Sequence, residues 1–240
     1  MTILGIETAT ERLGAAILTR DGRLFERRTE SRSSHCELLA GFITELAAES
    51  GVPLERIEGI AVSVGPGSFT GLRIGIATAM GLAYGLGIPA CGVNTLAALA
   101  YAAGLDGALV CPLIDAKRSE AYAAVYRVCG DMPETVVEPA AVPVARLAAV
   151  IAGLREPVVL TGPAAEKFRP IIEAAGTHPL DILPPESAQP SAAAVARIGR
   201  LLFASGGGGS PASLSPIYLR RSDAEFAKPK PSPFAVRREG

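Results

Sequence analysis

The sequence predicts an α/β fold in two halves, each a mixed β-sheet with helices covering its faces. Three observations favour this fold. Apolar, strand-like runs alternate with helix-like runs along the 240 residues. The order strand, strand, strand, helix, strand, helix occurs twice. Each copy starts with strands close enough in sequence to form hairpins and continues through helix crossovers, which makes the sheet part antiparallel and part parallel.

The first copy covers roughly the first hundred residues. Apolar residues at helical spacing predict its first helix, and Asn94 is the expected N-terminal cap of its last one. A Gly-Pro-Gly-Ser turn separates a buried strand from a helix of small residues. We expect strands at residues 2–6, 13–19, 23–30, 59–64 and 88–93, and helices at about 34–50, 69–85 and 95–104.

The second copy repeats this order without evident sequence identity to the first. What the copies share is a carboxylate that closes the first strand, Glu7 in one and Asp115 in the other. We expect strands at 108–114, 120–128, 135–138 and 157–160, and helices at 143–154 and 163–175, followed by a helix at 191–204 and a glycine linker. The predicted ranges are 1–104 for the first half, 105–220 for the second, and 221–240 for a basic, proline-rich tail that we expect to be disordered.

Composition excludes several classes of protein. The chain carries 23 Lys and Arg against 24 Asp and Glu and is 49% hydrophobic. It is therefore neither wholly disordered nor a generally basic nucleic-acid binder. Four scattered cysteines predict reduced thiols in a cytoplasmic protein. The uncharged run from Ile74 to Leu105 is long enough to cross a membrane, but glycines and Pro89 interrupt it, so we interpret it as helix, strand and helix, with no membrane span.

Gly65, Gly67 and Ser68 form a turn between a buried strand and a helix N-terminus, where backbone N–H groups could hold an anion. The glycine spacing is that of neither a phosphate-binding loop with Gly-Lys-Ser/Thr nor the dinucleotide fingerprint. The alternative is a tight turn that allows close helix packing. Both interpretations stay open at this stage.

The strand-end carboxylates suggest a second candidate site. Glu7, Thr8 and Thr10 follow the first strand of one half, and Asp115 follows its counterpart in the other. Facing each other across a cleft, such groups could hold a phosphate-bound Mg²⁺. The alternative is that each carboxylate pairs locally. The two histidines, His35 and His178, lie too far apart in sequence to assemble a metal site with the cysteines, so we expect no metal centre.

The helix at 69–85 carries an unusual outward stripe. Ala77, Met80 and Tyr84 fall on the same face as charged Arg73, which should point away from the core. A stripe of small, methionine and tyrosine residues on that face suggests a partner helix, or else cover by the chain's own C-terminal segment.

Several segments together resemble a known family. They are ILGIETAT, SHCELL, VSVGPGSFTGLRIG, GIPACGVNTLAALA, LIDAKRSEAY, LTGPAAEKF and SPIYLR, in the same order as in the TsaB (YeaZ) family, over residues 3 to about 220. The resemblance implies the duplicated fold of the actin-like, Hsp70 and sugar-kinase ATPases (ASKHA, ribonuclease H-like). It also implies a complex with a TsaD catalytic subunit and a TsaE ATPase. Together these proteins transfer threonylcarbamoyl to N6 of the adenosine next to the anticodon in tRNAs reading codons that start with A.

The resemblance further implies a subunit that is not itself an enzyme. In TsaD-like chains a His-x-x-x-His metal motif occupies the positions that are Thr95 and Leu99 here, and neither side chain can replace an imidazole. We therefore expect no tightly bound cofactor, with ATP or ADP and Mg²⁺ at most at the junction with the partner. We expect this chain to contact tRNA only as part of the complex.

The resemblance places the partner interface on the two helices of the first half, and the same surface would form a homodimer when TsaD is absent. The expected interface residues are Leu39, Phe42, Ile43, Leu46, Arg73, Ala77, Met80 and Tyr84. The rival interpretation is a nucleotide-binding ATPase or small kinase of the same fold. Its phosphate site would use Glu7, Thr8, Thr10, Gly65, Gly67, Ser68 and Asp115. A third interpretation is a tRNA-binding module that binds tRNA through the basic tail.

Overall fold

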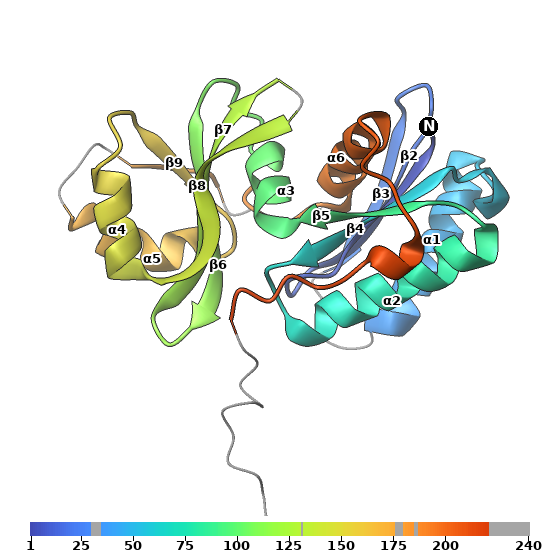
Figure 1. Ribbon diagram of the computed structural model, residues 1–240, viewed down its shortest axis with the longest axis horizontal. Coiled ribbons are helices and arrows are strands. Elements are labelled where there is room, and N and C mark those ends of the chain that lie inside the picture. Colours follow the sequence, from blue (N-terminus) through green and yellow to red (C-terminus); the bar gives the residue numbers. More distant parts are fainter. Residues whose placement is uncertain (30–34, 131, 176–179, 185–186, 221–240) are drawn as a thin grey trace, which may run out of the picture.

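The computed structural model describes residues 1–29, 35–130, 132–175, 180–184 and 187–220. The predicted disordered tail, residues 221–240, lies outside this part of the chain. Two mixed sheets lie side by side, each flanked by helices, as the sequence predicts (Figure 1). Each sheet has five strands, and the second contains a short strand at residues 181–182 that the sequence did not predict.

The first sheet has the order β3-β2-β1-β4-β5. Its antiparallel part comprises β1 (Ile3–Glu7), β2 (Leu13–Leu18) and β3 (Leu24–Thr29). Its parallel part adds β4 (Gly59–Gly65) and β5 (Ala90–Asn94) beside β1. Every residue of β1, β2 and β4 is buried, because helices cover both faces of the sheet.

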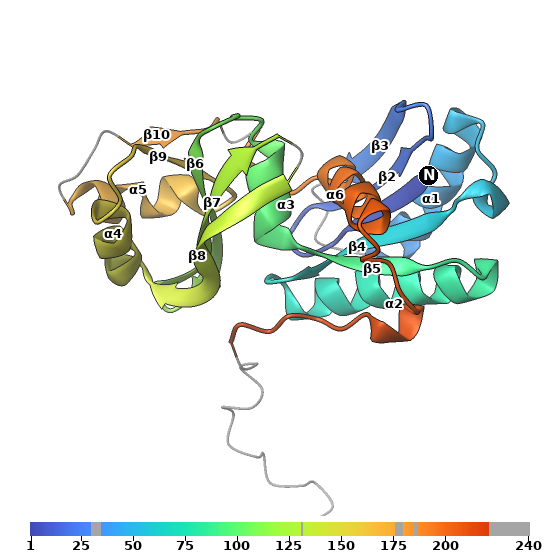
Figure 2. The ribbon, with the colours of Figure 1, turned by 45° about the horizontal axis from the view of Figure 1, so that its top comes forward.

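Two layers of helices enclose this sheet (Figure 2). On one face lie α1 (His35–Ser50) and α2 (Phe69–Leu86). The short helix η1 (Leu54–Arg56) and then β4 lie between them in the chain. Leu4, Ile60 and Val62 pack on that side. On the other face lies α6 (Ala192–Ala204), against which Ile3 and Ala61 pack. The alternation along each strand thus divides the core into two layers.

The second sheet repeats the topology of the first, with the order β10-β9-β6-β7-β8. Its antiparallel strands are β6 (Leu109–Lys117), β7 (Glu120–Cys129) and β8 (Met132–Pro143), and its parallel strands are β9 (Val158–Thr161) and β10 (Asp181–Ile182). Helices α4 (Val144–Ala152) and α5 (Ala165–Glu173) cover one face.

Strand β8 is three times as long as the sequence predicts. Pro133, Pro139 and Pro143 lie within or at the end of it, and prolines argue against a strand. Because β8 is the edge of its sheet and pairs only with β7, its outer backbone needs no N–H donors. The prolines are therefore tolerated there.

Helix α3 (Thr95–Ala102) joins the two halves. Asn94 caps it as predicted, with Oδ1 accepting from the N–H groups of Leu96 and Ala97 at 2.9 and 3.2 Å. Leu96 and Leu99 pack against Val110 and Tyr126 of the second sheet. The uncharged run that includes α3 resolves into α2, β5 and α3, the three elements the sequence predicts.

The chain returns to the first half after the second sheet. Although the predicted second-half range, 105–220, includes α6, this helix packs on β1, β2 and β4 of the first sheet. The short helix η2 (Pro211–Ser213) then contacts α2. Periodicity identifies α6 as a helix but carries no information on which sheet it covers.

Among the described residues, α2 is the one helix that by length and composition alone could cross a membrane. A third of it is buried in the chain, on the side that carries Leu72, Ile76 and Ala83.

Candidate functional site

The glycine-rich turn brings helix α2 into direct backbone contact with the loop after β1. A Cβ atom added at Gly67 would lie 2.2 Å from the carbonyl oxygen of Ala9, and one at Gly71 would lie 2.1 Å from that of Thr8. At Gly75 it would lie 2.2 Å from Thr8 Oγ1. The spacing of four residues puts Gly71 and Gly75 on one side of the helix, and Gly67 lies in the turn just before it; at all three positions only a hydrogen atom fits.

Three N–H groups at this turn are paired within the chain. The Ser68 N–H donates to the Ala9 carbonyl at 2.6 Å, and the Gly71 N–H donates to Ser68 Oγ at 3.3 Å, which caps the helix. The Leu72 N–H donates to the Ser68 carbonyl at 2.9 Å. Of the two interpretations of the motif, the structure therefore supports the tight turn with close helix packing.

Glu7 is buried at the end of β1, with 1% of its surface exposed. Its Oε1 accepts a hydrogen bond from the Ala9 N–H at 2.5 Å, while Oε2 finds no partner among the described residues. Burial raises the pKa of Glu7 to about 7, and its hydrogen bonds offset only part of that effect. The carboxyl group therefore exchanges its proton near neutral pH.

Asp115 occupies the equivalent position on β6 but has the opposite surroundings. Its Oδ2 lies 2.8 Å from the Lys167 ammonium and 3.5 Å from that of Lys117, and its Oδ1 accepts from the Lys117 N–H at 2.8 Å. Partial burial works against the charged form, but these cations and hydrogen bonds outweigh it and hold the pKa of Asp115 below its usual value.

The two carboxylates therefore each bond locally, which is the alternative raised from the sequence. Thr10 also bonds locally, since its Oγ1 accepts from the Arg12 N–H at 3.3 Å. A Mg²⁺ site needs charged, accessible oxygens. Glu7 is enclosed and readily protonated, and the oxygens of Asp115 face two ammonium groups, so these residues do not fit that role. In the described ranges no cluster of three His, Cys, Asp or Glu residues is placed to bind a metal.

One alternative raised from the sequence is that the C-terminal segment covers the outward stripe of α2, and this segment does cross the glycine turn at the start of that helix. The Ile217 N–H donates to the Val64 carbonyl at 2.7 Å, next to Gly65. The ring of Tyr218 stacks on Phe69 with centroids 5.0 Å apart, and Arg73 Nε donates to its hydroxyl at 3.2 Å.

Arg220 then donates to the Ala116 carbonyl of β6. The segment thus links the start of α2 to the second half and covers the Arg73 end of the outward stripe (Figure 2).

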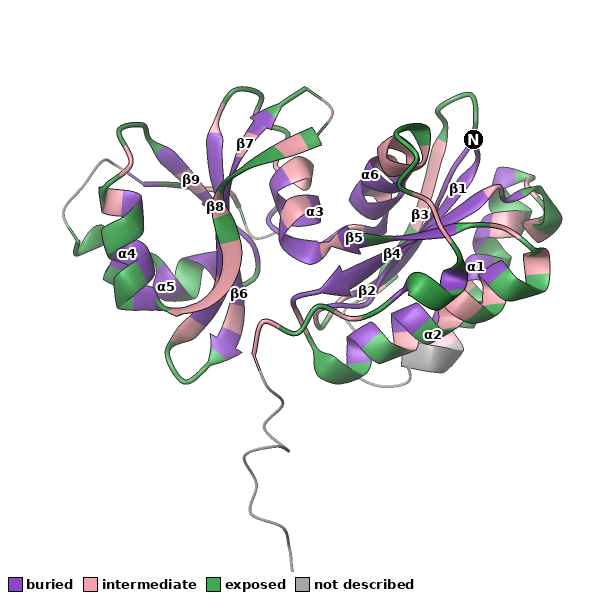
Figure 3. Cartoon of the chain, in the orientation of Figure 1, coloured by how far each residue is buried: buried purple, intermediate pink, exposed green. Residues whose placement is uncertain are grey.

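The rest of the stripe is open, as the burial colours show (Figure 3). We call it the outer face of α2; it consists of Ala77, Met80, Gly81, Tyr84 and Gly85. Tyr84 is 57% exposed and Met80 is half-buried. Between Arg73 and the C-terminal end of α2 the sequence has no charged residue, so this face offers an uncharged surface to a partner.

Part of the expected interface is corrected by the structure. Leu39, Ile43 and Leu46 of α1 are 0%, 3% and 0% exposed and lie in the core under the first sheet, and Phe42 packs against them half-buried. An apolar stripe at helical spacing normally faces the core, and here it does. From residue 38 onward, the positions that α1 exposes are Ala40, Gly41, Thr44, Glu45, Ala48 and Glu49.

Thr95 and Leu99 lie in α3, where both are buried. Leu99 belongs to the apolar cluster that joins the halves, and Thr95 Oγ1 finds no hydrogen-bond partner among the described residues. His35 lies at the first position of α1, and His178 lies outside the described residues.

Comparison with known proteins identifies the family. The model for TsaD, tRNA N6-adenosine threonylcarbamoyltransferase, matches residues 29–198. The chain belongs to this family. The tRNA threonylcarbamoyladenosine biosynthesis protein TsaB of Bacillus subtilis is 34% identical to it over 137 residues, 57% of this chain and 60% of that protein. TsaB of Escherichia coli is 40% identical over 129 residues, 53% and 55% of the respective chains.

The matched segments thus span a little more than half the length of these curated relatives. A solved structure of YeaZ from Pseudomonas aeruginosa is 27% identical and superposes with a TM-score of 0.79, covering 91% of this chain and 99% of that one. The predicted resemblance to TsaB (YeaZ) and the duplicated ASKHA-type fold are confirmed.

Replacing Gly71 by alanine should destabilise the chain by about 1–3 kcal/mol, because the new methyl group meets a backbone carbonyl that cannot rotate away. The matched control is Gly81→Ala on the same helix, where nothing lies within 4 Å. That change should stabilise by about 0.5–1 kcal/mol through helix propensity. Urea unfolding of both variants checks the prediction, and equal shifts would contradict the backbone contact.

Glu7→Gln should remove a pH-dependent cost of folding. The pKa of Glu7 is higher in the folded chain than its ordinary 4.5, so the folded state binds the extra proton and stability falls as pH rises from about 4.5 through 7. Above that range the wild type should be less stable than Glu7→Gln by up to about 3 kcal/mol, and near pH 4.5 the difference should vanish.

Urea midpoints at pH 5 and pH 8 measure this difference. Glu55→Gln, which changes an exposed carboxylate, serves as the control and should leave the pH dependence as it is. A constant offset between Glu7→Gln and wild type at both pH values would show that Glu7 does not titrate in this range.

Proposed function

We propose that this chain is a non-catalytic subunit that binds a TsaD-type transferase and holds it in its active arrangement. The transferase would transfer threonylcarbamoyl to N6 of the adenosine next to the anticodon in tRNAs reading A-starting codons. Membership of the TsaD family and similarity to proteins named for threonylcarbamoyladenosine biosynthesis support this role.

The observation that carries the proposal is the outer face of α2. It is solvent-exposed, uncharged and fixed in place, because the opposite side of the same helix rests on the Thr8 backbone at Gly71 and on the Thr8 side chain at Gly75. A pre-organised surface loses little conformational entropy on binding. Small residues such as Ala77 and Gly81 let a second helix approach closely, and Tyr84 supplies the large amphipathic side chain typical of interface centres.

The absence of catalysis is also part of the proposal. The two positions of the metal motif carry a threonine and a leucine, both enclosed in the fold. Of the strand-end carboxylates, Glu7 is sealed in the core and Asp115 is neutralised by lysines. These surroundings favour a scaffold over the rival interpretation, an ATPase or small kinase that would work at that site.

The remaining partners follow from the same role. We propose that a TsaE-type ATPase and tRNA bind to the complex and not to this chain alone. We also propose that the outer face of α2 pairs with a second copy of this chain when the TsaD-type subunit is absent. Nucleotide and Mg²⁺ would belong to the junction with the partner, and the complex would act in the cytoplasm.

Reconstituted tRNA modification tests the proposal. Purified TsaD-type and TsaE-type proteins, tRNA and threonylcarbamoyl-adenylate are combined with and without this chain, and the modified nucleoside is quantified by mass spectrometry. We expect product to depend on the chain, with the TsaD-type subunit alone giving at most a few per cent of the complete mixture. Equal product in both mixtures would contradict the role.

Ala77→Glu should weaken binding to the TsaD-type subunit by more than tenfold, because a carboxylate at a closely packed contact loses its water without gaining a partner. Position 77 is exposed in the free chain, so the fold should be unaffected. Calorimetry measures the affinity, and thermal unfolding confirms the fold.

The matched control is Ile171→Glu, an equally drastic change at a 44% exposed position on α5. It should leave the affinity unchanged. Loss of binding in the control, or unchanged binding of Ala77→Glu, would contradict the proposal that the docking surface lies on α2.

A further inference from the structure

An exposed aromatic cluster lies at the start of α2, where the C-terminal segment crosses it. We define this aromatic cluster as Phe69, Arg73, Ile217 and Tyr218. Its three large apolar side chains, Phe69, Ile217 and Tyr218, are 39%, 37% and 42% exposed. Single exposed apolar side chains are ordinary on a protein surface, whereas a contiguous group of them marks a contact site.

Backbone contacts fix the C-terminal part of the aromatic cluster in place. The Ile217 N–H donates to the Val64 carbonyl at 2.7 Å, and Leu214 packs in the core under α2. The segment lies directly on the glycine turn, because a Cβ atom added at Gly65 would be 2.7 Å from the Ile217 carbonyl oxygen. Tyr218 therefore has a defined position beside α2, although its side chain is exposed.

Arg73 is held between the two rings of the cluster. Its guanidinium carbon lies 3.8 Å from the centroid of the Phe69 ring, and its Nε donates to the Tyr218 hydroxyl at 3.2 Å. A cation over an aromatic face is attracted to that ring. The ring contact and the hydrogen bond together order this side chain before any partner arrives, so little rotamer entropy is left to lose on binding.

The outer nitrogens of the Arg73 guanidinium group have no partner in the described part of the chain. Its Nε bonds Tyr218, while no carboxylate lies within ion-pair distance and neither Nη atom has a hydrogen bond there. Arg127 shows the contact that such a fork makes, since its two Nη atoms donate to the two carboxylate oxygens of Glu156 at 3.0 and 2.7 Å. Arg73 presents the same fork without the carboxylate.

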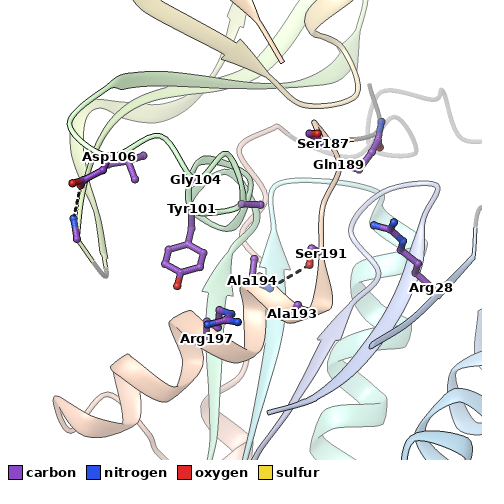
Figure 4. Close-up of a pocket in the computed structure, with 13 residues that line it drawn as sticks. Arg28, Tyr101, Gly104, Asp106, Ser187, Gln189, Ser191, Ala193, Ala194 and Arg197 are labelled. Carbon is purple, nitrogen blue, oxygen red and sulfur yellow. Dashed lines mark hydrogen bonds between the residues drawn. The ribbon is translucent and has the colours of Figure 1, made fainter. Parts of the chain in front are cut away.

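Arg28 and Arg197 also lack an ion pair within the described ranges, but they differ from Arg73 in how they are held. Both line an open cavity of about 690 Å³ between the halves, on different sides of the start of α6 (Figure 4). Neither guanidinium group has a ring contact or a hydrogen bond to a described residue. Of these three arginines, Arg73 is thus the one whose fork is already oriented.

The aromatic cluster continues the outer face of α2. The spacing of four residues puts Phe69, Arg73 and Ala77 on one stripe of the helix, and Tyr84 lies two turns further along it. All four side chains are exposed. A partner seated on the outer face therefore reaches Arg73 along the same side of the helix. Tyrosine and arginine are the residues on which binding energy at interfaces is most often concentrated.

We propose that Arg73 binds an aspartate or glutamate carboxylate of the TsaD-type subunit, with Phe69 and Tyr218 enclosing the ion pair. This inference rests on the proposed function, because it names the chemistry of the same docking surface. A carboxylate fits better than the phosphates of a nucleic acid. Nucleic-acid surfaces carry several cations, whereas Arg73 is the one charged residue of α2. Tyr218 is a positioning residue that orients the guanidinium group.

Arg73→Met tests the ion pair, since methionine keeps an unbranched side chain and removes the charge. Binding to the TsaD-type subunit, measured by calorimetry, should weaken by at least about tenfold. The affinity should also depend less on salt, because salt screens the ion pair that the wild type makes. Arg146→Met removes the same charge at an exposed position of α4, outside the cluster, and should leave both the affinity and its salt dependence unchanged.

Conservative variants separate an ion pair from a merely structural clamp. Arg73→Lys keeps the charge but not the fork, and should remain weaker than wild type by at least about threefold. Tyr218→Phe keeps the stacked ring but removes the hydroxyl group that orients Arg73. It should weaken binding while the thermal unfolding temperature stays close to that of wild type. Arg73→Glu should abolish binding, and changing one acidic residue of the TsaD-type subunit to arginine should restore it.

The outcomes separate this inference from the subunit role. If the wild-type complex forms and Arg73→Met matches its affinity and salt dependence, the ion pair is overturned and the role stands. If the wild-type chain does not bind the TsaD-type subunit, both fail. Normal binding of Arg73→Met to the subunit with weakened binding of tRNA to the assembled complex would place a phosphate at Arg73 and overturn the proposal. Failure of every acidic-to-arginine change to rescue Arg73→Glu would also contradict a carboxylate partner.

Discussion

The contact on which the rest of the first half depends is that between the backbone of α2 and the backbone after β1. At Gly67 and Gly71 no side chain separates the two, and at Gly75 the buried side chain of Thr8 fills the space. Helix and sheet therefore have one mutual position, set by the carbonyl oxygens of Thr8 and Ala9 and by the short, buried side chain of Thr8. A helix held so closely on one side presents its other side at a defined place. The glycines of this turn thus serve to position a surface.

The duplication of the fold gives two equivalent strand ends with unlike environments. Glu7 lies under the first half's helices, and burial makes its protonated form easy to reach, whereas Asp115 lies at the surface between two lysines. The difference follows from what packs around each strand end. Helix α6 returns to cover the first sheet, and the C-terminal segment crosses the glycine turn and ends on the backbone of β6. Two connections thus join the halves: helix α3, which packs on the second sheet, and the C-terminal segment, which ends on β6.

Local sequence features predicted what depends on local physics. Strand and helix order, the Asn94 cap and the exposed stripe of α2 follow from periodicity and side-chain chemistry, and the structure contains them. Features that depend on distant partners were missed. Leu39, Ile43 and Leu46 look alike whether they face a partner or their own core, and β8 contains prolines that only its edge position allows. The cavity between the halves is lined by Arg28, Tyr101 and Arg197, residues far apart in sequence that no motif connects.

The central claim, that the outer face of α2 is a docking surface, is tested most directly by oxidative footprinting. Tyr84 and Met80 lie on this face, and Met132, at the start of β8 in the second sheet, is a 38% exposed reference. Oxidation of each is measured by mass spectrometry with and without a TsaD-type subunit. Docking on α2 predicts that Tyr84 and Met80 become protected severalfold while Met132 is oxidised as before. Unchanged oxidation of Tyr84 and Met80 in a complex shown to have formed would contradict the claim.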